Sequence, residues 1–207
     1  MALSFEFDFE VTKAALLYLA SKELPNFDKY RAVKLLFLAD REHLLRFGRP
    51  ITGDDYSALP YGPTPNRVLC FLDGLETVAN EGADPSSDEV AELSRCLAVK
   101  NLAHPTYYAL VEPDLDFLSK TDLIALDIAV TEHGRKSFED LMDLTHGMKA
   151  YTESWRPNSQ RKKFPMPFEN FFADAPEKAE FLNELEEDQQ ILRKFSQPIE
   201  VPKVMGA

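Results

Sequence analysis

The chain has 207 residues, 44% of them hydrophobic, and a formal net charge of −12. A chain of this length can bury a core without disulfides or a structural metal. Its acidic balance disfavours nucleic acid as a partner, because phosphates are bound by Lys and Arg. No run approaches the ~18 apolar residues of a membrane span, and residues 1–10 are acidic where a signal peptide is basic. We therefore expect a cytoplasmic protein without a membrane contact.

Two helices are predicted in the N-terminal part. Apolar residues recur at helical spacing over Phe9–Leu24 and over Phe27–Phe47. The second range is apolar around much of its circumference, so it is expected at the centre of the fold. Asp40 lies on its apolar face, where we expect the carboxylate to cap a backbone group or to pair with a neighbour such as Arg49.

A connection rich in proline and glycine follows over Gly48–Pro65. Within it, Asp55–Leu59 is predicted as a short strand. Thr64 and Pro65 are predicted as the N-cap and the first residue of a helix that continues to about Asn80, because threonine accepts from an orphan amide and proline lacks that donor. The prolines of this connection restrict the backbone already in the unfolded chain. The sharp turns between these elements therefore cost little additional backbone entropy on folding.

Short elements are predicted in the middle of the chain. Asp88–Leu97 is predicted as a short helix and Thr106–Glu112 as a strand, because the latter is aromatic and β-branched. We expect this strand to pair with Asp55–Leu59 in a small sheet. Capping-box sequences then begin two further helices, at Ser119 and at Ser137.

A last helix is predicted over about Ala175–Phe195, capped by Asp174, with a narrow apolar stripe and a strongly acidic outer face. The fold class is therefore mainly α (α+β): a multi-helix globular domain with a small two- or three-stranded antiparallel sheet and a C-terminal helix. We divide the chain into a main domain (1–155), a basic, proline-bearing connector (156–174), the C-terminal acidic helix (175–196) and a tail (197–207) that is expected to be disordered.

The sequence carries no recognisable catalytic constellation. Its histidines lie outside HExxH and Cys/His patterns, its cysteines have no CxxC spacing, and it has neither a phosphate-binding glycine loop nor a GxSxG elbow. We therefore assign no catalytic, cofactor-binding or metal-binding residue and expect a protein that is not an enzyme. A small hydrolase that uses residues such as Asp40, His43 and His146 is the least favoured alternative.

One basic segment interrupts the acidic chain. Between Trp155 and Phe164 it carries Arg156, Arg161, Lys162 and Lys163. Aromatic rings beside cations can stack on bases, so this is the one local signal for nucleic acid. The alternative that we favour is an exposed loop that balances nearby acidic residues, such as those of the last helix.

Several motifs follow one another along the chain: KLLFLAD at Lys34–Asp40, GRPI at Gly48–Ile51, YSA at Tyr56–Ala58, GP at Gly62–Pro63, and later TYYAL and DLDFLSKTDLIALDIAV. In this order they resemble the SocA/Panacea domain family of prokaryotic antitoxins. The resemblance extends over about Ala14–Trp155. Thr64 departs from the pattern, because an aliphatic residue is expected after the Gly-Pro pair.

The resemblance implies a non-enzymatic antitoxin without a cofactor. It would neutralise a toxin encoded in the same operon by direct binding, as a hetero-oligomer. Two other roles stay open: an adaptor that delivers the toxin to a protease, and a DNA-binding autoregulator. The net charge and the lack of a helix-turn-helix signature disfavour the autoregulator.

Two sets of residues follow from this interpretation. Aromatic side chains anchor interfaces, and an acidic surface suits a basic site on a toxin, so the toxin-interface candidates are Tyr56, Leu59, Tyr61, Tyr107, Tyr108, Trp155, Glu184, Glu186, Glu187 and Asp188. For the connection we favour a structural corner over direct toxin contact, which makes Asp40, Arg49, Pro50, Gly62 and Pro63 scaffold residues first.

Overall fold

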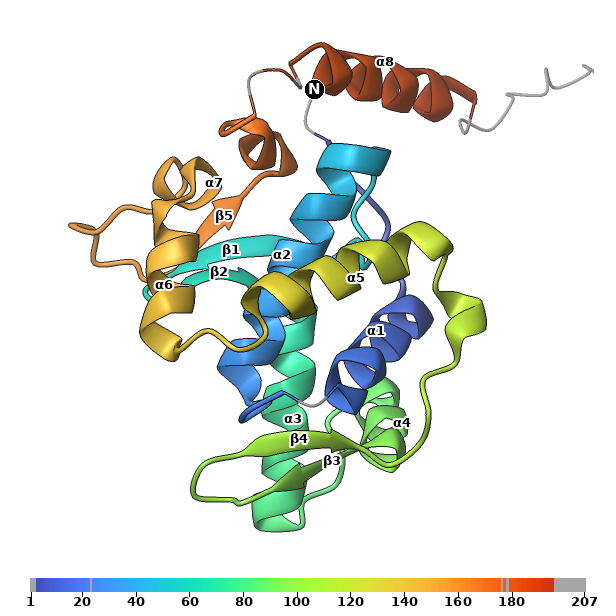
Figure 1. Ribbon diagram of the computed structural model, residues 1–207, viewed down its shortest axis with the longest axis vertical. Coiled ribbons are helices and arrows are strands. Elements are labelled where there is room, and N and C mark those ends of the chain that lie inside the picture. The colour runs from blue at the N-terminus through green and yellow to red at the C-terminus, as the bar shows by residue number, and fades with distance from the viewer. Residues whose placement is uncertain (1–2, 23, 176, 178, 196–207) are drawn as a thin grey trace, which may run out of the picture.

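The computed structural model describes residues 3–22, 24–175, 177 and 179–195. Within these ranges the chain is mainly helical with two small antiparallel sheets, which confirms the predicted fold class (Figure 1). The helices are α1 (Phe9–Ser21), α2 (Lys29–Phe47), α3 (Asn66–Glu81), α4 (Asp88–Cys96), α5 (Lys120–His133), α6 (Phe138–Gly147), α7 (Lys149–Thr152) and α8 (Ala179–Phe195). The strands are β1 (Tyr56–Leu59), β2 (Gly62–Pro65), β3 (Leu97–Lys100), β4 (Thr106–Ala109) and β5 (Phe164–Met166), and the 3-10 helices are η1 (Leu115–Phe117) and η2 (Phe168–Phe172).

Helix α2 lies at the centre of the fold, as its apolar pattern predicts. In Figure 1 it passes through the middle of the molecule, and α5 packs against it. The Asp28 side chain caps its N-terminus by accepting from the Arg31 amide, and Gly48 ends it with a left-handed φ of 79°. Because most of α2 is buried, its polar side chains need partners inside the protein.

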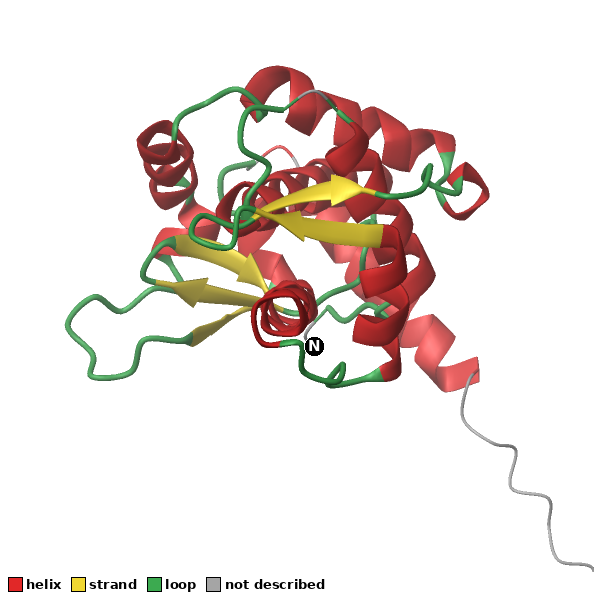
Figure 2. Cartoon of the chain, turned by 90° about the horizontal axis from the view of Figure 1, so that it is seen from below, coloured by secondary structure: helices red, strands yellow, loops and turns green. Residues whose placement is uncertain are grey.

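The larger sheet has the strand order β2-β1-β5, and β3 pairs with β4 in a separate hairpin (Figure 2). The expected pairing of Thr106–Glu112 with Asp55–Leu59 is wrong, because β4 pairs with Leu97–Lys100. Both edges of β1 are occupied by β2 and β5. Helix α4 leads directly into β3, so β4 finds its partner close by in the sequence.

Residues 156–174 contribute to the core. A basic loop, orange at the left of Figure 1, leads into β5. The 3-10 helix η2 then buries Phe168, Phe171 and Phe172. Phe171 packs edge-on against Phe37 of α2, with ring centroids 5.4 Å apart. A segment whose composition indicates a connector therefore supplies one strand and three core aromatic residues.

The N-caps of helices agree with the sequence prediction where the capping residue directly precedes the helix. The capping boxes predicted at Ser119 and Ser137 are present. The cap predicted at Asp174 is wrong, because its carboxylate accepts from the Lys149 amide at the start of α7, at 2.9 Å from Oδ2. Met148 precedes α7 and offers no capping side chain, so a carboxylate distant in sequence takes that role.

Helix α3 is also capped from a distance. The predicted N-cap, Thr64, lies in β2, so that prediction is wrong. The N-cap position is held by Pro65, whose side chain has no acceptor. Instead, the Asp54 carboxylate accepts from the amides of Arg67 and Val68 at 2.9 and 3.0 Å. The connection before α3 thus caps the helix from outside it.

Helix α8 packs on the body of the protein through part of its predicted stripe. Phe181 and Leu185 contact the core, and the Gln189 side chain exchanges two hydrogen bonds with the backbone of Ser4. Leu192, further along, is 64% exposed. The tail predicted over 197–207 lies outside the described residues. Among the described helices, none combines the length and the apolar character needed to cross a membrane.

Candidate partner-binding surface

Asp40 organises the connection that follows α2. Its side chain is fully buried. Oδ1 accepts from the amides of Ile51 and Thr52 at 2.8 and 3.0 Å, and Oδ2 accepts from the hydroxyls of Thr52 and Tyr56. We call these four residues the Asp40 hub. Burial raises the pKa of Asp40, and the four hydrogen bonds oppose that shift. Of the two roles expected for Asp40, the capping of backbone groups is confirmed. The pairing with Arg49 is wrong, because the hub donors occupy the carboxylate and Arg49 donates to Asp122.

Arg49 instead joins the connection to α5. Its guanidinium donates to the Asp122 carboxylate at 2.9 Å. His43 Nδ1 lies 2.7 Å from the Arg49 carbonyl and therefore donates to it, and Nε2 lies 2.9 Å from the Thr121 hydroxyl and 3.0 Å from Asp122 Oδ1. Burial lowers the pKa of His43, and the hydrogen bond to the Arg49 carbonyl and the charge of Asp122 oppose that shift. These contacts fix the start of the connection against α5.

Lys34 of α2 supports the β1–β2 turn through a hydrogen bond. This lysine is 1% exposed, and its ammonium donates to the Pro63 carbonyl at 2.7 Å. Burial lowers its pKa to about 7. Gly62 has a φ of 101°, and a Cβ there would lie 3.1 Å from Lys34 Nζ and 3.0 Å from Thr145 Oγ1. Glycine is therefore required at this position. Pro50, Gly62 and Pro63 are all buried.

The three residues of the hydrolase alternative do not share an open site. Asp40 and His43 are fully buried. His146 lies on α6 and stacks on Tyr151 with ring centroids 4.4 Å apart. In the parts of the chain that the structure describes, no three His, Cys, Asp or Glu side chains gather as a metal site would require.

A pocket of about 770 Å³ opens beside the β1–β2 turn. Its walls come from the start of α2, from α3 and from the loop between β3 and β4, and Leu59 and Tyr61 of the turn line it. We call it the α2 pocket. Glu76 lines one wall of this pocket. Its carboxylate pairs with Lys29 at 2.6 Å and accepts from the Tyr107 hydroxyl.

Three aromatic residues form a rim at this pocket. The Tyr30 and Phe138 ring centroids are 4.3 Å apart, and those of Phe138 and Tyr61 are 6.1 Å apart. Tyr61 is 64% exposed and Phe138 is 42% exposed. We call Tyr30, Tyr61 and Phe138 the aromatic rim. Exposed aromatic side chains beside a pocket are the usual composition of a binding surface.

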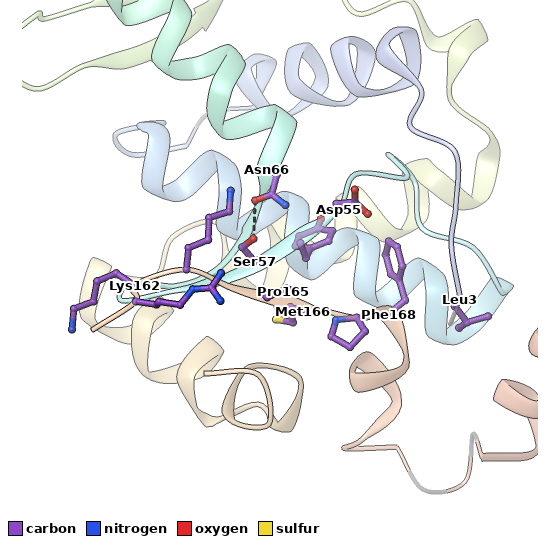
Figure 3. Close-up of a pocket in the computed structure, with 12 residues that line it drawn as sticks. Leu3, Asp55, Ser57, Asn66, Lys162, Pro165, Met166 and Phe168 are labelled. Atoms are coloured by element: carbon purple, nitrogen blue, oxygen red, sulfur yellow. Dashed lines mark hydrogen bonds between the residues drawn. The ribbon is translucent and has the colours of Figure 1, made fainter. Parts of the chain in front are cut away.

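A second pocket, of about 710 Å³, lies along β5, and we call it the β5 pocket. In Figure 3 the side chains of Ser57 and Asn66 meet above it, where the hydroxyl donates to Asn66 Oδ1 at 2.9 Å. Lys162 lies at one end of the pocket and Asp55 lies toward the other. Positive and negative charge therefore stand at different ends of one opening.

Two of the interface candidates are buried. Tyr56 and Tyr107 are 3% and 4% exposed, and their hydroxyls donate to Asp40 and to Glu76. Neither offers a free aromatic surface in this structure. Tyr61, in contrast, has most of its side chain exposed. The tyrosines that the sequence groups together as interface candidates therefore divide into buried core residues and exposed surface residues.

The other interface candidates lie nearer the surface. Leu59 and Tyr108 are half-buried. Trp155 is half-buried between Tyr151 and Phe164, with ring centroids at 5.9 and 5.6 Å. On α8, the exposed acidic residues are Glu184, Glu187 and Asp188, and Glu186 is half-buried.

Sequence reasoning missed Tyr30, Lys34 and Phe138. Tyr30 and Phe138 come from different helices and meet Tyr61 only in the fold, so no local pattern connects them. Lys34 did carry a signal. A lysine within the most apolar helix indicates a buried cation that needs a specific acceptor.

Comparison with known proteins supports the family. No similar curated protein and no similar solved structure was found. The family described as "Antitoxin SocA-like, Panacea domain" matches residues 33–151, which is more than half of the chain. The matched range contains the Asp40 hub, the β1–β2 turn and Phe138. The chain therefore belongs to the SocA-like antitoxin family with a Panacea domain.

Proposed function

We propose that this chain neutralises a toxin encoded beside it by binding that toxin directly, and that it acts as a stoichiometric binder rather than as a catalyst. The family match over residues 33–151 carries the proposal, because it supports an antitoxin role. The acidic net charge of −12 is compatible with a partner that has a basic surface.

In this proposal the toxin contacts the aromatic rim and the α2 pocket. Exposed Tyr and Phe side chains bury a large area at a small cost in conformational entropy, and such residues dominate binding energy at interfaces. Tyr61 and Phe138 are the exposed members of the rim. The pocket of about 770 Å³ beside them can accept a side chain of the partner.

The test is co-expression with the product of the neighbouring reading frame, read as cell growth and as co-purification. The wild-type chain should restore growth and form a stable complex. Tyr61→Ala/Phe138→Ala should lose both while its unfolding midpoint stays close to that of the wild type. Phe117→Ala/Ile124→Ala removes apolar side chains of similar exposure elsewhere (41% and 47%) and should behave as the wild type does.

The acidic outer face of α8 is the competing contact. Reversal of Glu184, Glu186, Glu187 and Asp188 to Lys should abolish rescue if this face covers a basic site on the toxin. Our proposal predicts that the reversed protein still restores growth. Rescue that survives loss of the rim but not reversal of α8 would move the interface to α8. A harmless neighbouring product, or one that never co-purifies, would contradict the function itself.

A further inference from the structure

The basic loop before β5 carries cations without counter-ions. Within the described residues, no ion pair joins Arg156, Arg161, Lys162 or Lys163 to a carboxylate, so the balancing contact with α8 that the sequence suggested is not observed. Arg156 and Lys162 donate to backbone carbonyls of their own loop instead. The exposed positive charges of this loop are therefore available to another molecule, in a chain whose net charge is −12.

Three of these cations, Arg161, Lys162 and Lys163, line the β5 pocket. The pocket adds a neutral donor, because Ser57 occupies Oδ1 of Asn66 and leaves its Nδ2 amide without a partner among the described residues. Along one side runs β5, which has Pro165 at its centre and pairs with β1 in the described sheet.

The other end of the β5 pocket has a different character. Figure 3 shows Phe168 and Leu3 on the side where Asp55 lies, away from Lys162. Leu3, Met166 and Phe168 supply apolar wall at this end. An occupant that suits the whole pocket therefore carries negative charge at the loop end and apolar or uncharged groups near Asp55.

We propose that the β5 pocket binds an extended acidic segment of the toxin, whose carboxylates pair with Arg161, Lys162 and Lys163 and whose backbone accepts from Asn66. The inference rests on the proposed function for the identity of the partner. An extended segment fits because the pocket reaches from the basic loop, past the Asn66 amide, to the apolar wall at Phe168 and Leu3. The guanidinium and ammonium groups supply charge-assisted hydrogen bonds to the carboxylates.

Nucleic acid fits the same pocket less well. A continuous polyanion would bring phosphate toward Asp55 at the far end. It would also approach a protein whose net charge is −12, against an unfavourable long-range field. A peptide can place its carboxylates at the loop end alone.

The probe is a fluorescein-labelled hexapeptide of three glutamates followed by three alanines, titrated with the full chain at low salt and followed by fluorescence anisotropy. Arg161→Glu/Lys162→Glu/Lys163→Glu should weaken its binding about tenfold or more. Arg95→Glu/Lys100→Glu/Lys120→Glu is the matched control, because it makes the same change in net charge at exposed sites on other elements. The control should bind the peptide within about twofold of the wild type, because none of its three residues lines the β5 pocket.

Three results would overturn the inference. Equal weakening by both triple variants would show that net charge, and not the pocket, attracts the peptide. Tighter binding of a short oligothymidylate than of the glutamate–alanine peptide would identify a nucleic-acid site. A loop variant that loses the peptide but binds the co-expressed toxin as the wild type does would show that the segment does not come from the toxin. That last result would leave the proposed function intact. Failure of the wild-type chain to neutralise the toxin would remove the proposed function and with it the identity of the partner, but not the binding of the acidic peptide.

Discussion

The Asp40 hub fixes the start of the connection between α2 and α3, and the β1–β2 turn lies further along that connection. The side chains of the two regions differ in burial and in hydrogen bonding. In the hub, one fully buried carboxylate receives four hydrogen bonds. In the turn, Tyr61 is 64% exposed, and its ring centroid lies 6.1 Å from that of Phe138. The first half of the connection therefore fixes the fold, and the second half presents an aromatic side chain from that fixed base.

Removal of the hub carboxylate should have the largest effect on stability. Asp40→Ala leaves two buried amides and two buried hydroxyls without an acceptor, so we expect a loss of about 3–5 kcal/mol in the free energy of unfolding. Urea denaturation measures it. Asp55→Ala, at an exposed position in the same connection, should change stability by less than about 0.5 kcal/mol. Similar losses for both variants would remove the distinction that we draw for the hub.

The buried lysine under the turn should make stability depend on pH in a defined window. Its pKa is about 7 in the folded protein and 10.5 in the unfolded chain, so between these values the unfolded chain binds more protons. Stability then rises with pH, by about 2 kcal/mol between pH 7 and pH 9. The difference between the wild type and Lys34→Met isolates this contribution. Parallel pH profiles for the two proteins would contradict it.

Loss of the distant cap of α3 should have a smaller effect. Asp54→Ala leaves the amides of Arg67 and Val68 without their acceptor, and we expect a loss of about 1–2 kcal/mol. Asp54→Asn keeps one side-chain oxygen and should lose less than the alanine variant. If the asparagine variant is the less stable of the two, the carboxylate serves some other purpose than capping.

Truncation of the exposed tyrosine should have the smallest effect on stability. Tyr61→Ala should change the free energy of unfolding by less than about 0.5 kcal/mol, because its side chain is mostly in solvent. A loss as large as that of Asp54→Ala would make Tyr61 part of the scaffold and would blur the comparison with the hub.

What the sequence predicts well is local. Capping boxes at Ser119 and Ser137 and the apolar face of α2 involve residues within a few turns of one another, and these predictions are confirmed. What it misses is set by tertiary contact. The carboxylates of Asp54 and Asp174 cap helices to which they do not belong.

The same limit applies to the candidate site. Residue type points to Tyr61 as a candidate interface anchor, but its neighbours on the rim come from α2 and α6. Tyr56 and Tyr107 have the same residue type and lie on strands, yet burial and hydroxyl partners separate them from Tyr61. Residue type alone does not distinguish an interface anchor from a core aromatic.

The dissociation constant of the purified antitoxin–toxin complex tests the central claim most directly. Isothermal titration should compare the wild-type chain with Tyr61→Ala/Phe138→Ala, each with its unfolding midpoint recorded. We predict binding at least about tenfold weaker for the double variant, which corresponds to about 1.4 kcal/mol, with an unchanged midpoint. A dissociation constant equal to that of the wild type would contradict recognition through the aromatic rim.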